Sequence, residues 1–151
     1  MNPKIIVALL IITAACTGHR PPDAWIRIRP GSTVDRLVFD ISQSPRSDAP
    51  GDIGHFRVDH CAALRGDGRA DREDEPVWLV NPGPRRPTSL TVLEYGQEEE
   101  GWETLVPPAR LLPGCYWITN LTANEIGFIV HESGAVTEIL YEEALRIANS
   151  Q

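Results

Sequence analysis

The sequence predicts an all-β domain, an antiparallel β-sandwich of about seven to nine short strands with a possible short C-terminal helix. Short segments in which apolar and polar residues alternate recur between residues 25 and 141, and this is the period of a half-buried strand. The 13 prolines and 12 glycines are spread through the chain, where they favour turns and disfavour long helices. The sandwich is therefore expected over residues 24–141.

The expected strands are separated by turns rich in Gly, Pro and Asp. They cover residues 25–29, 37–42, 55–61, 77–80, 90–95, 102–106, 115–120, 126–130 and 136–141. The last two flank Ser133-Gly134, which predicts a hairpin. Residues 142–151 are expected to form a short helix or a tail, because acidic residues near the start and Arg146 near the end suit a helix dipole.

The N-terminal residues have the three parts of an export signal. Lys4 supplies a positive charge, residues 5–12 are apolar throughout, and small residues follow them. A membrane-spanning helix needs about 20 apolar residues, so this run is too short to span a bilayer. It favours a signal that is cleaved, over residues 1–15.

The segment Thr13-Ala14-Ala15-Cys16 resembles the lipobox of bacterial lipoproteins, although that motif usually has an aliphatic residue in place of Thr13. The resemblance implies cleavage after Ala15 and a diacylglycerol on the Cys16 thiol. Each buried methylene of such a lipid adds about 0.8 kcal/mol, and two or more acyl chains hold a protein firmly on its membrane. The alternative is an ordinary secretory signal in which Cys16 stands by chance.

The same resemblance implies a location in the cell envelope. Thr17 replaces the Asp that commonly retains such lipoproteins at the inner membrane, so the outer membrane, facing the periplasm, is expected if the organism is Gram-negative. Residues 16–23, with two prolines, are expected to form a short stiff tether. The expected partners are the membrane, through the lipid on Cys16, and an envelope protein or glycan.

The remaining cysteines, Cys61 and Cys115, form an even pair, and an exported protein meets an oxidising compartment. A disulfide between them would close a long loop and add about 4 kcal/mol to the stability. Two buried free thiols or a metal site are the alternatives. Neither cysteine belongs to a CxxC motif, which argues against a catalytic dithiol.

The charge of the chain excludes several classes of partner. The formal net charge is −7, and loss of the signal removes Lys4, the only lysine, so the mature charge becomes −8. An acidic surface repels nucleic acid and anionic lipid headgroups, and a chain without lysine cannot use a lysine amine. No nucleic-acid partner is expected, and no motif indicates a cofactor.

Residues 112–118, Leu-Pro-Gly-Cys-Tyr-Trp-Ile, resemble the L-x-P-G-x-Y strand of transthyretin-like and carboxypeptidase-regulatory-like β-sandwiches. In those domains the Pro-Gly pair turns the chain and the Tyr begins a central strand. The resemblance supports a β-sandwich and implies no activity. Cys115 precedes Tyr116, whereas an immunoglobulin-type domain places its second Cys two residues after the Tyr.

Three histidines and one aspartate are the candidates for a metal or acid–base site. His55 and Asp59 share a face of one expected strand but lie about 13 Å apart along it, which is too far to share one ion. His60 points to the other face, and His131 is remote in sequence. Polar decoration of a strand is the competing interpretation.

The charged segment 65–75 offers the oxygen ligands that calcium prefers. Residues 67–71 resemble the second half of a calcium loop, with Asp67, Asp71 and Asp74 as candidate ligands, but the first half of that motif is missing. A solvated acidic loop is the competing interpretation.

Motifs of nucleophilic catalysis and nucleotide binding are absent from the sequence. There is no GxSxG, P-loop, GxGxxG or HExxH segment, although paired carboxylates stay open as an alternative. Trp117 is expected in the core, whereas an exposed Trp78 or Trp102 would favour contact with a glycan or a protein.

Three hypotheses follow from these observations. The leading one is a noncatalytic, membrane-anchored envelope lipoprotein whose sandwich binds or scaffolds another envelope component. The second is an envelope hydrolase or metal-dependent enzyme that uses His55, His60, His131 and nearby acids. The third is a calcium-stiffened adhesion module built on residues 67–75.

Overall fold

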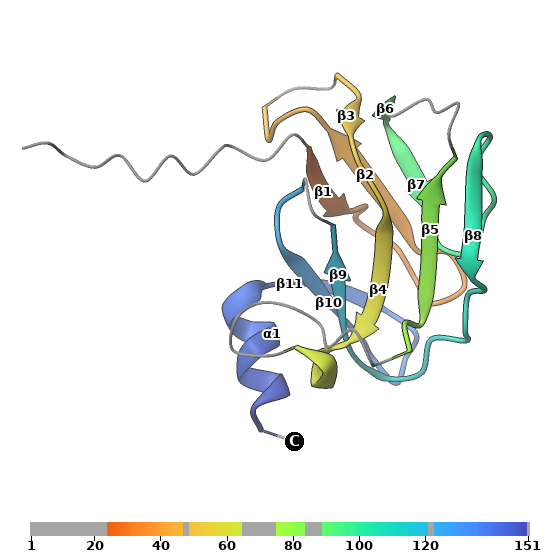
Figure 1. Cartoon of the computed structure of the whole chain (residues 1–151). Helices are drawn as coiled ribbons and strands as arrows, with labels where there is room; N and C mark the ends of the chain where they lie inside the picture. The colour runs from red at the N-terminus through yellow and green to blue at the C-terminus, as the bar shows by residue number, and fades with distance from the viewer. Residues whose placement is uncertain (1–23, 47–48, 65–74, 84–88, 121–122, 151) are drawn as a thin grey trace, which may run out of the picture.

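Two antiparallel sheets pack face to face, and a short helix lies against the outer surface of the larger one (Figure 1). The structure is a computed structural model that describes residues 24–46, 49–64, 75–83, 89–120 and 123–150. This arrangement confirms the predicted antiparallel β-sandwich. Within the described residues, no helix is long and apolar enough to cross a membrane.

The strands of the larger sheet are β4 (Phe56–His60), β5 (Trp78–Pro82), β8 (Trp102–Val106), β9 (Gly114–Thr119), β10 (Ile126–Val130) and β11 (Val136–Leu140). Their order across the sheet is β11-β10-β9-β4-β5-β8. The other strands are β1 (Trp25–Ile28), β2 (Val38–Ser42), β3 (Gly51–Asp52), β6 (Ser89–Leu90) and β7 (Val92–Glu94). The smaller sheet has the order β1-β2-β7, and β3 pairs with β6 in a separate ladder.

Apolar side chains on the inner faces of the two sheets form the main core. Phe39 of β2 lies near Phe56 of β4 and Phe128 of β10, with ring centroids 4.9 and 6.3 Å away. Trp78 is fully buried, and its ring lies 5.8 Å from that of Phe56. Burial of each such side chain stabilises the fold by about 1.5–3 kcal/mol, so apolar burial in this core is the main contribution that holds the two sheets together.

Each of the nine predicted strand segments overlaps a strand of the structure. The described residues hold two further strands, β3 and β6, which have only two residues each and are too short to show a period of two. The predicted hairpin is confirmed, since Val130 pairs with Val136 and Gly134 turns the chain at φ 81°. The helix α1 (Tyr141–Ala148) occupies the predicted helical segment and begins one residue earlier.

A second apolar cluster lies on the outer face of the larger sheet. It joins Trp117 and Cys115 of β9 to Ala144 of α1 and to Cys61. The predicted disulfide between Cys61 and Cys115 is confirmed, with Cα atoms 5.3 Å apart. Cys61 was expected on the same strand as His55, but β4 ends at His60 and Cys61 opens the 3-10 turn η1 (Cys61–Ala63). The bridge therefore ties this turn to the start of β9.

The sandwich has two distinct ends. Ala24, where the described chain begins, forms a bridge with Ala123, and the Asn124 side chain bonds both the N–H and the carbonyl of Ile26. This tether end lies where β9 finishes and β10 starts. We call the opposite end the distal end, and there β9 starts and β4 and β10 finish (Figure 1).

Candidate functional site

The connection from β8 to β9 crosses the distal end of the sandwich, and we call its residues 107–113 the crossing segment. Leu111 is 4% exposed and anchors the segment in the core. The Ala109 N–H donates to the Val77 carbonyl at 2.9 Å. Because prolines restrict the backbone, the three prolines of the segment reduce the entropy lost when it is held in this position.

Two tyrosine hydroxyls fasten the crossing segment to the sheets. Tyr95 Oη donates to the Ala109 carbonyl at 2.8 Å. Tyr116 Oη donates to the Leu112 carbonyl at 2.8 Å and accepts from the Leu112 N–H at 2.9 Å. This contact of a strand tyrosine with backbone four residues upstream resembles the tyrosine corner of immunoglobulin-type sandwiches, although here the cysteine, Cys115, directly precedes the tyrosine.

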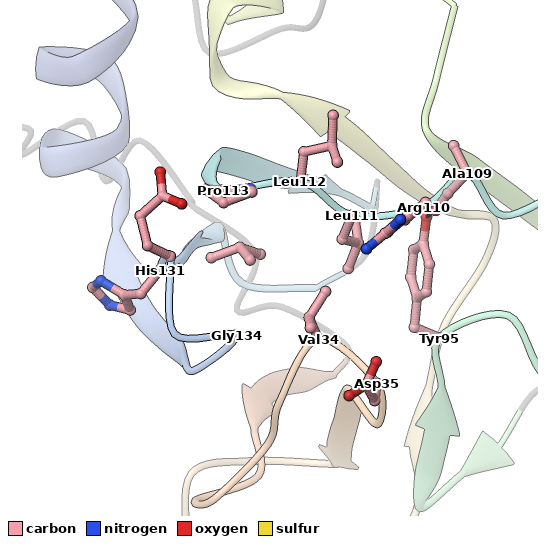
Figure 2. A pocket seen from close by; sticks show the side chains of 12 residues that line it. Val34, Asp35, Tyr95, Ala109, Arg110, Leu111, Leu112, Pro113, His131 and Gly134 are labelled. Atoms are coloured by element: carbon pink, nitrogen blue, oxygen red, sulfur yellow. Dashed lines mark hydrogen bonds between the residues drawn. The ribbon is translucent and has the colours of Figure 1, made fainter.

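Two hollows lie on either side of the crossing segment and share the lining residues Ala109, Arg110 and Leu112. The first hollow, shown in Figure 2, has a volume of about 240 Å³. Its remaining lining residues are Val34, Asp35, Tyr95, Leu111, Pro113, Val130, His131, Glu132 and Gly134. The second hollow has a volume of about 400 Å³ and is completed by His60, Glu75, Pro76, Val77, Val106, Pro107 and Tyr116.

Arg110 differs from the other charged residues around the first hollow. Figure 2 shows it on the Tyr95 side, next to Leu111, whereas the His131 ring lies on the opposite side and points away from the hollow. The His131 ring is engaged with Thr137, with Nε2 2.9 Å from Oγ1. Of the basic side chains that line the hollows, Arg110 is therefore the one placed to meet a ligand in both.

The structure does not bring the predicted histidine candidates together. His60 lies against the Tyr116 ring, with centroids 4.9 Å apart, whereas His131 bonds Thr137 beside the hairpin turn. His55 is half-buried at the other end of β4, where burial and the nearby Arg57 lower its pKa. Within the described residues, no group of three or more His, Cys, Asp or Glu side chains is arranged to hold a metal ion.

Asp59 has a different role from the one its strand position suggested. It was expected as polar decoration, but it is 1% exposed. Arg57 donates its Nε–H to both carboxylate oxygens at 2.8 Å, and its Nη2 lies 2.7 Å from Oδ1. Asp59 is paired in register with Trp117, whose side chain belongs to the apolar cluster under α1, so the Arg57–Asp59 pair lies beside this cluster in the folded interior.

Several predicted site residues lie outside the described residues. These are Cys16 and the calcium candidates Asp67, Asp71 and Asp74. Among the tryptophans, Trp117 is buried as expected, and Trp78 is also fully buried, so it offers no surface to a glycan. Trp102 is half-buried on β8, away from both hollows.

Sequence reasoning missed the crossing segment as a site. Its composition, with prolines around Ala109-Arg110-Leu111-Leu112, suggested only a turn between strands. The available signal was the spacing of Leu112 and Tyr116, four residues apart, which is that of a tyrosine corner.

No protein-family model, no curated protein and no solved structure matches this chain. The distal end must therefore be interpreted from its own geometry and chemistry.

Replacing Tyr116 by Phe is expected to lower the free energy of unfolding by about 1–2 kcal/mol, because one hydroxyl makes two hydrogen bonds to the crossing segment. Urea unfolding followed by tryptophan fluorescence measures the change. Tyr141→Phe is the matched control, since the Tyr141 hydroxyl makes no hydrogen bond to the described residues. Equal stability of the two variants would contradict a fastening role for Tyr116.

Alkaline pH is expected to destabilise the fold through the same tyrosines. Burial raises the pKa of both Tyr95 and Tyr116 above the ordinary value of 10.0, because the buried site disfavours the phenolate. Their contribution to stability is therefore complete below about pH 10 and is lost as the pH rises further. Urea midpoints measured across this range should fall less steeply in the Tyr95→Phe/Tyr116→Phe double variant than in the unmodified protein, and parallel curves would refute the assignment.

Proposed function

We propose that this protein is a membrane-anchored envelope lipoprotein, with lipid on Cys16, and that its sandwich is a noncatalytic module that binds or scaffolds another envelope component. The observation that carries the proposal is that the start of the sandwich and the two hollows lie at opposite ends of the fold. Ala24, which follows the expected tether in sequence, lies at the tether end, and both hollows lie at the distal end. An anchored domain with this polarity holds its hollowed end away from the membrane.

The length of the tether supports this orientation. Residues 16–23 reach at most about 28 Å when fully extended, so the tether end stays close to the bilayer. The acidic net charge of the mature chain disfavours contact with anionic headgroups, which keeps the sandwich off the membrane surface. The Cys61–Cys115 bridge also suits an oxidising envelope compartment.

A further support is Leu112, a large apolar side chain that is 59% exposed between the two hollows. Exposed apolar groups beside concave surface are typical of contact sites between proteins. The segment that presents Leu112 is held by the Tyr95 and Tyr116 hydroxyls, so a partner would meet a preorganised surface.

Site-specific photocrosslinking in cells tests the proposal. A photoreactive phenylalanine analogue at Leu112 is expected to capture a discrete envelope component from the full-length, membrane-bound chain. The matched control places the same analogue at Glu125, an exposed residue at the tether end. Capture at Glu125 with none at Leu112 would overturn the assignment of the distal end as the contact surface.

A further inference from the structure

Arg110 stands apart from most of the arginines that the structure describes. Five arginines each have a carboxylate within 4.0 Å, namely Arg27 with Glu138, Arg29 with Asp40, Arg36 with Glu94, Arg57 with Asp59 and Arg146 with Glu143. Arg110 has no such partner among the described residues, although the mature chain is strongly acidic. An exposed guanidinium without an internal carboxylate is available to one brought by a partner.

The surroundings of Arg110 define what kind of carboxylate fits. It lines both hollows, and its neighbours on the crossing segment, Leu111 and Leu112, are apolar. Val34 and Val130 add aliphatic surface to the first hollow, and Val77 and Val106 add it to the second. Arg110 thus has aliphatic surface on both sides. Such a surface suits a ligand that carries one carboxylate with apolar groups on both sides of it.

The acidic residues that line the hollows limit the number of negative charges that a ligand can carry. Asp35 and Glu132 line the first hollow and Glu75 lines the second. These carboxylates repel a ligand that carries many negative charges, such as a polyanion, and leave Arg110 as the attractive point. The ligand therefore needs a single well-placed carboxylate, and a polyacidic one is disfavoured.

We propose that the distal end binds an extended peptide segment of a partner protein, in which one Asp or Glu pairs with Arg110 and flanking apolar side chains occupy the two hollows. This inference rests on the proposed function and assigns the chemistry of its ligand. Arg110 supplies specificity through a charge-assisted hydrogen bond, and Leu112 supplies apolar contact at the centre of the surface.

Selection from a phage-displayed library of random dodecapeptides on the immobilised, detergent-solubilised full chain tests this inference. The expected result is a consensus with one acidic residue between apolar positions. Arg110→Gln is expected to weaken binding of the selected peptide about tenfold or more, as is replacement of its acidic residue by the corresponding amide. Arg46→Gln, which removes the same charge from an exposed arginine near the tether end, is expected to leave binding unchanged.

The outcomes separate this inference from the proposed function. A consensus without an acidic residue, or selected peptides that bind Arg110→Gln and the unmodified chain equally, would overturn the role of Arg110. Failure to enrich any peptide, with binding of a chitin-derived oligosaccharide instead, would overturn the peptide ligand. In each case photocrosslinking at Leu112 still reports independently on whether the distal end contacts an envelope component.

Discussion

Replacing Asp59 by Asn is expected to lower the free energy of unfolding by about 3 kcal/mol, the largest loss we expect from a single polar substitution on the sheet. Asp59 is 1% exposed and the Arg57 side chain 16% exposed, so the variant removes the Asp59 carboxylate from beside a mostly buried guanidinium. The small remaining exposure of Arg57 places the loss at the lower end of the range for broken buried pairs.

Asp40→Asn is the matched control for this prediction. It removes the carboxylate of the Arg29–Asp40 pair, whose side chains are 44% and 42% exposed, so water can solvate the remaining charge. Urea unfolding of both variants measures the difference, and a much smaller effect is expected for Asp40→Asn. Similar losses in both variants would mean that burial of the Arg57–Asp59 pair does not govern its contribution.

The Cys61→Ala/Cys115→Ala variant, which lacks the disulfide, is expected to have a free energy of unfolding lower by about 4 kcal/mol. The reason is that the bridge reduces the number of conformations open to the unfolded chain. The two cysteines are 54 residues apart in sequence, and the segment between them contains β5, β6, β7 and β8. The bridge also ties η1 to β9 beside α1, so α1 is expected to loosen when it is broken.

The unmodified protein under reducing conditions is the control for the cysteine variant. It keeps both sulfur atoms in the apolar cluster and lacks only the covalent bond, so it separates the bond from the packing. Urea unfolding should place the reduced protein close to the double variant. A double variant as stable as the oxidised protein would show that the bridge contributes little.

The strands were predictable because their signal is a local pattern in the sequence, and the disulfide was predictable from the number of cysteines. Alternation over four to seven residues marks a half-buried strand, and an even pair of cysteines in an exported chain suggests a bridge. The strands β3 and β6 were not predictable, since two residues cannot display a period.

The burial of Asp59 was not predictable from the strand pattern. Period-two reasoning assigns the outer face of β4 to solvent, but α1, which begins some 80 residues later, packs with Trp117 on the neighbouring strand β9. The sequence does place Arg57 two residues before Asp59 on the same face of the strand, where it can pair with the carboxylate. What the sequence lacked was the information that an apolar cluster forms beside Asp59 on this face.

The distal site was hidden for a related reason. The residues of the first hollow come from the turn near Val34, the end of β7, the crossing segment and the end of β10, and only the sandwich brings them together. Arg110 was one arginine among many in the sequence. Its importance appears only in the structure, where five of the seven described arginines have a carboxylate partner and Arg110 lines both hollows without one.

Intact mass spectrometry of the membrane-purified protein, with and without reduction before alkylation, tests the central claim most directly. The account predicts a mass that lacks residues 1–15 and carries lipid, with Cys61 and Cys115 alkylated only after reduction. A full-length or unlipidated mass would contradict the anchored envelope module. Alkylation of Cys61 and Cys115 without reduction would contradict the bridged sandwich.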